Sequence, residues 1–385
     1  MITVLYICAD IELRGSTRSL SDLIDSVRDE VTPVVLLKEY GIAYDHFTKK
    51  GIECIVCRYQ MMLLSAHPWR DFIRRPWGWY PINYFRTDWR CKRYLKKYFK
   101  GRKIDLVHTN TSPMTIGKQL AKLFNVPHVW HVREGLDTGV HIPGGIYGGF
   151  QRLRKIIDHA DARIVISPQM QMRWQFREDN TWIIPDAIGK AADKCIEKDK
   201  SPYILFCSWF ITKEKGIYTV LEAYSKSGLS NDGISLMILG KCNDGRKKEL
   251  VSIAKMYGVN PEKLIFLPPQ LNIRPYFAKA KAFVTASLNE GLGRVTAEAM
   301  LYGCPVIALA SGGTIDLVND RENGYLFTST DECAKLMREV CLSPQESIVQ
   351  QAQADVISSL TQEVYGPKIL NVYKEVLKTR GINDR

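Results

Sequence analysis

The stretch Ser287-Leu-Asn-Glu-Gly-Leu-Gly-Arg-Val-Thr-Ala-Glu-Ala-Met300 follows an apolar run, 282–286, that has the composition of a buried strand. Gly291 and Gly293 let backbone N–H groups approach a ligand closely, and the residues after them have the pattern of a helix. A helix N-terminus favours bound anions because its free N–H groups carry partial positive charge. The stretch therefore predicts a strand, a phosphate-binding loop and a helix, in that order.

Two carboxylates flank this loop, because Glu290 lies directly before it and Glu298 lies in the helix that follows. Carboxylates accept hydrogen bonds from hydroxyl groups, so a polyhydroxylated ligand that carries phosphate suits the carboxylates and the loop together. The alternative is a glycine turn beside a helix-capping acid, since the first turn of any helix favours glutamate. The pattern by itself leaves both interpretations open.

Outward from this stretch, short β-branched runs alternate with amphipathic runs along most of the chain. Such alternation predicts an α/β fold with parallel sheets that are covered on both faces. The pattern is interrupted around 183–192, which favours two successive doubly wound units over one long sheet. The expected strands are 2–8, 33–38, 53–57, 105–109, 128–132 and 163–167, then 203–208, 235–239, 264–267, 282–286 and 305–309.

The length of 385 residues also favours two domains. We expect Rossmann-like domains at residues 1–187 and 188–385. Ligands of such folds bind at the carboxyl ends of the strands, so two facing domains predict a central cleft. The helical tail 354–377 is expected to pack back across both domains.

Composition is that of a folded soluble protein, with 45% hydrophobic and 24% charged residues. No apolar run reaches 18 residues, and the start Met1–Cys8 has the composition of a strand rather than of a signal peptide. We therefore expect a cytoplasmic protein. Cys54 and Cys57 form a CxxC pair without a matching second pair or histidines, so we expect buried free thiols and no metal site.

Positive charge is concentrated in the first half of the chain. The net charge is +12, and residues 1–185 hold 28 Lys and Arg against 18 Asp and Glu. Residues 68–103 alone contain twelve basic residues, two acids and eleven aromatics. Trp and Arg in alternation over Trp69–Tyr80 predict contact with an anionic membrane surface. From Cys91 onward the alternative is a crossover helix with a solvated basic side.

Residues Glu290–Glu298, followed by Ala-Met-Leu-Tyr-Gly-Cys-Pro305, resemble the E-x7-E signature of retaining GT-B glycosyltransferases, specifically glycosyltransferase family 4. Other segments resemble the family's landmarks in the same order: 12–15, 129–134, 206–216, 236–240, 264–269, 311–316 and 323–327. The resemblance extends over nearly the whole chain, although only 290–306 is specific on its own. It implies a GT-B fold and a retaining, metal-independent transfer from a nucleotide sugar, a UDP- or GDP-sugar, without a further cofactor.

The same resemblance implies roles for individual residues of the second half. Glu298 would hold the ribose hydroxyls and Glu290 the hydroxyls of the transferred sugar. Lys215 would neutralise the departing diphosphate, together with the backbone amides of the loop. The donor-binding loop residues are Gly291, Leu292, Gly293 and Arg294.

Two residues of the first half receive roles from the resemblance as well. His131 would lie beside the donor sugar, and Gly15 would let the first loop approach the phosphates or the acceptor. A buried structural histidine is the alternative for His131, and a solvated loop lysine is the alternative for Lys215.

The chain departs from the family pattern at two places. The family has a Gly-Arg pair before the lysine, whereas this chain has Ser208-Trp209-Phe210 and no arginine there. Arg294 is our candidate for the missing charge. Pro185-Asp-Ala-Ile188 stands where the family often has Pro-Asn-Gly.

The leading interpretation is an enzyme that adds a sugar to a cell-surface glycan or lipid-linked acceptor, peripherally bound at the inner membrane face. Two alternatives are a nucleotide-sugar epimerase of the same fold, which would use more acid/base groups, and a non-catalytic nucleotide-sugar-binding or membrane-associated protein with a degraded site. A nucleic-acid partner is not expected, because the basic half contains no recognition motif for one.

Overall fold

The computed structural model describes residues 1–61, 79–134, 149–288 and 290–381. Its contacts divide the chain into two compact units. Unit 1 comprises Met1–Ala187 and Tyr365–Arg385, and unit 2 comprises Ile188–Val364. From the sequence we predicted that the last residues of the chain belong to the second domain, 188–385. In the structure, residues 365–385 belong to unit 1.

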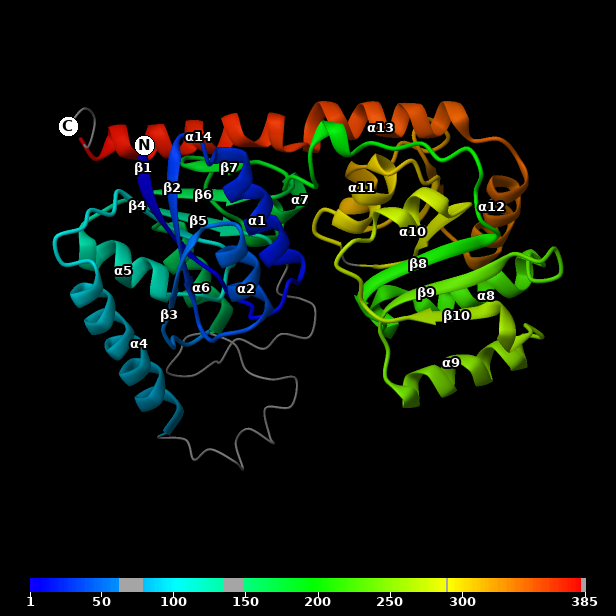
Figure 1. The fold of residues 1–385 in the computed structure, drawn as a ribbon, viewed down its shortest axis with the longest axis horizontal. Helices are drawn as coiled ribbons and strands as arrows, with labels where there is room; N and C mark the ends of the chain where they lie inside the picture. The colour runs from blue at the N-terminus through cyan, green and yellow to red at the C-terminus, as the bar shows by residue number, and fades with distance from the viewer. Residues whose placement is uncertain (62–78, 135–148, 289, 382–385) are drawn as a thin grey trace. The chain divides into compact units, whose positions relative to one another are not determined.

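Unit 1 is built on a seven-stranded parallel sheet with the order β3-β2-β1-β4-β5-β6-β7 (Figure 1). Six of its strands match the predicted ones to within two residues at either end. The seventh, β7, was missed because it is a three-residue edge strand, and its Ile183 is 42% exposed. The strands are β1 (Ile2–Ile7), β2 (Val31–Leu37), β3 (Glu53–Val56), β4 (Leu106–Thr109), β5 (His128–Val132), β6 (Ala162–Val165) and β7 (Thr181–Ile183).

Helices cover both faces of this sheet. One face packs against α1, α2 and α14, and the other against α4 and α5. The apolar positions recur at helical spacing, as in Leu20, Leu23, Ile24 and Val27 of α1, which are all buried. The helices of unit 1 are α1 (Gly15–Val27), α2 (Ile42–Lys49), α4 (Trp79–Tyr98), α5 (Ile116–Phe124), α6 (Gly149–Asp158) and α7 (Pro168–Trp174).

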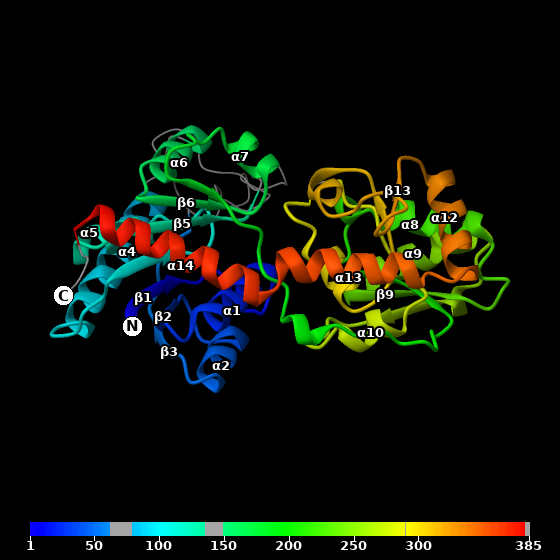
Figure 2. The ribbon, with the colours of Figure 1, turned by 90° about the horizontal axis from the view of Figure 1, so that it is seen from above.

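The last helix, α14 (Gln362–Thr379), runs along the sheet of unit 1 in Figure 2. Ile369, Val372 and Val376 of this helix are buried in the core of unit 1. The hydroxyl of Tyr373 also lies 2.8 Å from Nδ1 of His108 on β4. Apolar burial and this buried hydrogen bond together hold the end of the chain on unit 1.

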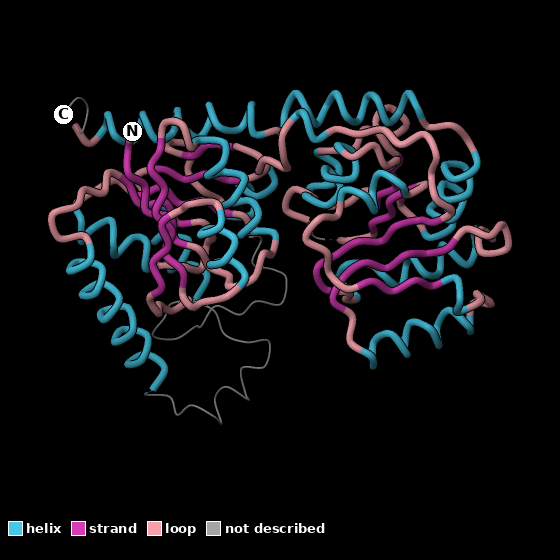
Figure 3. Tube along the Cα trace, in the orientation of Figure 1, coloured by secondary structure: helices cyan, strands magenta, loops and turns pink. Residues whose placement is uncertain are grey.

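Unit 2 repeats the architecture with a six-stranded parallel sheet in the order β10-β9-β8-β11-β12-β13. Figure 3 draws the strands of both units in magenta and the helices in cyan. The strand β13, which has only three residues, was not predicted from the sequence. The strands are β8 (Tyr203–Phe210), β9 (Ser235–Lys241), β10 (Leu264–Leu267), β11 (Ala282–Thr285), β12 (Val306–Leu309) and β13 (Tyr325–Phe327).

Two apolar clusters cover the faces of the second sheet. One includes α8, α9 and α12, and the other includes α10, α11 and α13. Both units are therefore parallel sheets between helices, which confirms the predicted pair of Rossmann-like domains. The helices are α8 (Ile217–Ser227), α9 (Asp244–Met256), α10 (Arg274–Lys279), α11 (Arg294–Leu301), α12 (Thr330–Leu342) and α13 (Glu346–Leu360).

Candidate functional site

The candidate donor site of unit 2 lies at the carboxyl ends of β8, β11 and β12. Parallel strands bring these ends to one edge of the sheet, where doubly wound folds bind ligands. The loop after β8 forms a single 3₁₀ turn, Lys213–Lys215, and ends at Gly216 with φ +77°. A Cβ at Gly216 would lie 2.2 Å from the backbone oxygen of Ala286. This glycine therefore lets the turn that carries Lys215 pack directly on the end of β11.

The loops after β11 and β12 also meet backbone to backbone. The backbone N–H of Gly313 donates to the backbone oxygen of Glu290 at 2.8 Å. A Cβ at Gly313 would lie 2.4 Å from the oxygen of Gly291, and Gly312 adopts φ +58°. Ser311 Oγ adds a hydrogen bond of 2.7 Å to the backbone oxygen of Leu288. The two glycines after β12 thus support the loop that was predicted to bind phosphate.

Two ion pairs join the predicted side chains of this site. Lys215 Nζ lies 2.6 Å from Glu290 Oε1, and both side chains are partly exposed. Arg294 Nε donates to Glu298 Oε1 at 3.2 Å, and the Glu298 carboxylate is almost completely buried. Gly293, with φ +78°, is the N-cap of α11, so the helix begins directly at the loop. Lys215, Glu290 and the N-terminus of α11 therefore belong to one polar edge.

His131 occupies the corresponding edge of unit 1, at the end of β5. Its side chain is fully buried, and its Nε2 lies 3.6 Å from Oδ1 of Asp186. Burial, and to a smaller extent the charge of Arg133, lowers the pKa of His131 well below its ordinary value. Among the described residues neither ring nitrogen has a hydrogen-bond partner. His131 is therefore a neutral imidazole with hydrogen-bonding capacity that these residues do not use.

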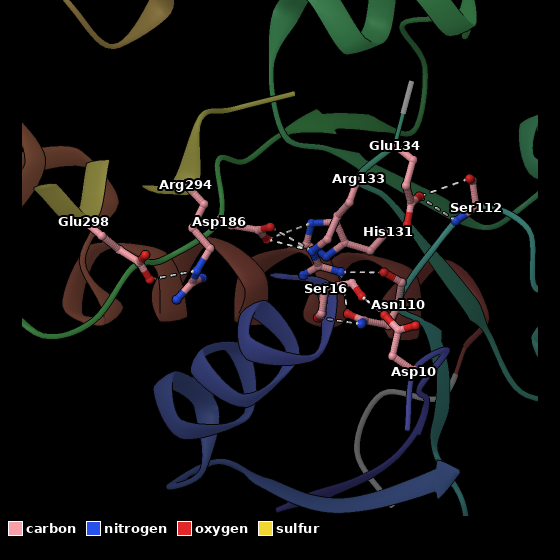
Figure 4. A network of polar contacts seen from close by, with 10 residues as sticks. All are labelled: Asp10, Ser16, Asn110, Ser112, His131, Arg133, Glu134, Asp186, Arg294 and Glu298. Atoms are coloured by element: carbon pink, nitrogen blue, oxygen red, sulfur yellow. Dashed lines mark hydrogen bonds and ion pairs between the residues drawn. The ribbon is translucent and has the colours of Figure 1, made fainter. Parts of the chain in front are cut away.

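Arg133, two residues further along the chain, is the centre of a buried polar network (Figure 4). Its Nε donates to both carboxylate oxygens of Asp186 at 2.9 Å. Its Nη1 donates to the backbone oxygen of Asn110 at 2.6 Å and also contacts the Asn110 side chain. Because a buried guanidinium requires a balancing charge, Arg133 explains why an aspartate stands at 186 where the family often has asparagine.

The network continues to the N-terminus of α1. Asn110 Nδ2 donates to the backbone oxygen of Ser16 at 2.9 Å, and Ser16 Oγ donates to Asp10 Oδ2 at 2.8 Å. Gly15 is the first residue of this helix, and a Cβ there would meet nothing within 4 Å. The described residues therefore leave open space at the position predicted to approach the ligand.

Sequence reasoning missed Arg133, Asp186 and Asn110 as members of a site. Arg133 and Asp186 are 53 residues apart, so their pairing has no local signature. The available signal was the departure from Pro-Asn-Gly at 185–187, because a carboxylate in place of an amide indicates a nearby cation. At the other departure from the family pattern, Ser208-Trp209-Phe210, the indole Nε1 of Trp209 is buried and has no hydrogen-bond partner among the described residues.

Several predictions concern other parts of the molecule. All ten cysteines are free, but only five of them are buried, and Cys54 and Cys57 are partly exposed rather than buried as predicted. The described residues contain no group of three or more His, Cys, Asp or Glu side chains placed to hold a metal ion. No helix in the described part of the chain has the length and apolar character of a membrane span. The predicted membrane segment Trp69–Tyr80 lies outside the described residues, except for the backbone of Trp79 and Tyr80 at the start of α4.

Each half of the chain matches the model of a known protein family. Residues 44–188 match the family model "Glycosyltransferase Family 4", and residues 190–355 match "Glycosyl transferases group 1". A lipopolysaccharide core biosynthesis glycosyltransferase, LpsE of Rhizobium meliloti, is 31% identical over 127 residues. This match takes in 33% of the chain and 35% of LpsE, so the chain spans about a third of that relative's length.

Solved structures resemble the whole chain. Anabaena Alr3699/HepE in complex with UDP and glucose has a TM-score of 0.76 at 18% identity, over 97% of this chain and 100% of that one. A glycosyltransferase from Rickettsia africae has a TM-score of 0.76 at 16% identity, over 98% of this chain and 99% of that one. At these identities the likeness establishes the fold. The two family models, which together match residues 44–188 and 190–355, identify the chain as a glycosyltransferase, and the solved structures show that it has the GT-B fold.

Proposed function

We propose that the chain transfers a sugar from a nucleotide-sugar donor to a glycan or lipid-linked acceptor, with retention of the anomeric configuration and without a metal ion. One observation carries this proposal. Lys215, Glu290 and the N-terminus of α11 meet at the carboxyl edge of the unit 2 sheet, where two glycine loops pack backbone to backbone. That edge offers a cation, a carboxylate and helix N–H groups to one ligand.

Each of these groups suits a different part of a nucleotide sugar. The ammonium of Lys215 and the N–H groups at the start of α11 would neutralise the diphosphate. On donor binding, Glu290 would give up its ion pair with Lys215 and accept hydrogen bonds from the hydroxyls of the sugar. The buried Glu298 carboxylate would accept hydrogen bonds from the ribose, with Arg294 holding its position and adding a positive charge near the diphosphate.

Charge that develops on the departing diphosphate is the main electrostatic problem of such a transfer. Fixed donors and cations that are aimed at this charge lower the barrier, because they need little reorganisation when the bond breaks. His131 would contribute as a neutral hydrogen-bonding group beside the sugar, since its pKa is held low by burial. The site residues therefore supply stabilisation and positioning without any step through a metal.

UDP is the first donor nucleotide to test, because the similar Anabaena protein was solved with UDP and glucose. A lipid-linked or cell-surface glycan is the acceptor class we propose, since LpsE is named for lipopolysaccharide core biosynthesis. With such an acceptor, the protein would work on the cytoplasmic side as a peripheral membrane protein.

One observation favours a second candidate, a nucleotide-sugar-binding protein that has lost catalysis. Trp209, near the end of β8, lies in the segment where the family has its Gly-Arg pair, so the diphosphate would have one cation fewer at the end of this strand. Binding of a UDP-sugar without measurable turnover would support this candidate.

A donor screen tests both candidates together. UDP-, GDP- and dTDP-sugars are compared by thermal unfolding and by release of the nucleotide, with and without EDTA. A ligand at 100 times its Kd adds about 2.7 kcal/mol to the free energy of unfolding, which is readily measured. The expected result is stabilisation and nucleotide release with one donor, unaffected by EDTA, and a product anomer that matches the donor by NMR. An inverted product would contradict the proposed mechanism.

A further inference from the structure

Helix α4 has two contrasting faces over the part whose side chains are described, from Phe85 onward. Its inner face packs into the core of unit 1 through Cys91 and Leu95, which are fully buried. Its outer face, away from the core, exposes Phe85 by 64% and Trp89 by 54% on the side of the helix that adjoins α5, and Tyr94 by 47% on the opposite side. A surface helix normally turns polar side chains to water, so aromatic exposure of this extent indicates an interaction surface.

Every other exposed residue between 85 and 100 is basic. The acid within this stretch, Asp88, is buried and accepts hydrogen bonds from the backbone N–H of Gln60 and from Gln119 Nε2. Burial raises the pKa of Asp88 to about 6. The outer face therefore presents positive charge and aromatic rings without an exposed carboxylate. The exposed basic residues are Arg86, Arg90, Arg93, Lys96, Lys97 and Lys100.

A groove of about 610 Å³ lies between α4 and α5, and cationic side chains line it. Lys92, Arg93 and Lys96 come from α4, and Lys122 comes from α5. Trp89 closes one part of the groove, with the guanidinium of Arg93 over its ring at 5.6 Å from the centroid. Four cations around one groove are suited to a phosphate group.

We propose that the outer face of α4 docks on a membrane surface that contains anionic phospholipids, and that the α4–α5 groove receives their phosphate headgroups. Aromatic rings lie favourably at the boundary between headgroups and acyl chains. Lys and Arg side chains extend along such a surface and place their charges at the phosphates. Phe85 and Trp89 are four residues apart, so their rings lie on one side of the helix and meet the surface together.

The proposed occupant is a lipid surface rather than a nucleic acid. Nucleic-acid binding would use the same cations but would leave the rings of Phe85 and Trp89 in water unless unpaired bases stacked on them. The inference rests on the proposed function in one respect, because it assumes that the acceptor is lipid-linked. Vesicle binding and sugar transfer are measured separately, so either can fail while the other holds.

The test is co-sedimentation of the full chain with phosphatidylcholine vesicles, with and without phosphatidylglycerol, at low and high salt. Each Lys or Arg near an anionic surface contributes roughly a fivefold factor in partitioning. Replacing Lys92, Lys96 and Lys122 by Gln should therefore weaken binding to the anionic vesicles roughly a hundredfold. Trp89→Ala should weaken it at high salt as well, because the contact of the ring is apolar.

Matched variants distinguish an effect of the groove on vesicle binding from an effect of the net charge of the protein. Replacement of Lys247, Lys248 and Lys255 on α9 by Gln removes the same charge from unit 2 and should leave vesicle binding unchanged. Lys-to-Arg replacement of the three groove residues should retain binding, and nucleotide release with a soluble acceptor should be unchanged in all variants. Three results overturn the proposal: no wild-type binding to anionic vesicles at low salt, equal losses in the groove and α9 variants, or a groove variant that loses binding to RNA but not to vesicles.

Discussion

Gly313 offers a test of the donor loop that removes no proposed ligand-binding side chain. Its backbone N–H donates to the oxygen of Glu290. In Gly313→Ala the new Cβ would lie 2.4 Å from the oxygen and 2.8 Å from the carbonyl carbon of Gly291. Since real Cβ contacts essentially never fall under 3.0 Å, one of the two loops must shift by roughly 0.6 Å or more.

Such a shift moves the backbone that leads into α11, where the diphosphate is proposed to bind. A displacement of about 1 Å can cost on the order of a hundredfold in rate when it misplaces a reacting group. We therefore expect Gly313→Ala to lower kcat/KM for the donor by about ten- to hundredfold. Overpacking should also lower the free energy of unfolding by about 1–3 kcal/mol.

The assay measures nucleotide release from the donor found in the screen, and urea unfolding measures stability in parallel. Gly245→Ala on α9 is the matched control, because its Cβ would meet only Asn243 Oδ1, at 3.5 Å. This control should keep wild-type activity and should not lose stability, because Ala is a better helix former than Gly. Wild-type kcat/KM in a folded Gly313→Ala protein would refute the idea that the packing of the two loops positions the donor.

Three further predictions follow from the site and the core. Lys215→Ala and Glu298→Ala should each weaken donor binding about ten- to hundredfold, since a hydrogen bond to a charged group contributes about 1.5–3 kcal/mol. Calorimetry measures the Kd of the donor, and an unchanged Kd in both variants would show that neither side chain contacts the donor. Asp186→Ala leaves the Arg133 guanidinium buried without its counter-charge and should cost about 3–5 kcal/mol of stability in urea unfolding, whereas Asp186→Asn, which keeps an acceptor, should cost less. An Asp186→Ala protein as stable as the wild type would contradict the role of Asp186 as the counter-charge. Burial lowers the pKa of His128 to about 3, so between about pH 6.5 and pH 3 the unfolded chain holds a proton on this residue that the folded chain does not, and His128 alone should lower the stability by about 1.4 kcal/mol per pH unit as the pH falls. His128→Gln should remove this share of the pH dependence of urea unfolding, and an unchanged slope would contradict the assignment.

The sequence by itself determined the elements and their order. Strand and helix periodicity are local properties, so alternating apolar runs predicted eleven of the strands, and the missed strands β7 and β13 are too short to show a period. The loop of Gly291 and Gly293 was likewise visible in the sequence, because its glycines and the helix after it are contiguous. Glu290, Glu298 and Lys215 were found through a resemblance in spacing to a known family.

Only the tertiary structure decided which of these residues meet. Lys215 and Glu290 are 75 residues apart, and they pair because parallel strands bring β8 and β11 to the same edge of the sheet. Arg133 and Asp186 could not be paired in advance, since many charged residues offered equivalent partners. The outer face of α4 was similarly undecided, because an amphipathic pattern does not specify which aromatic side chains the rest of the fold covers. Burial is the sum of contacts from distant parts of the chain, and these contacts exist only in the folded molecule.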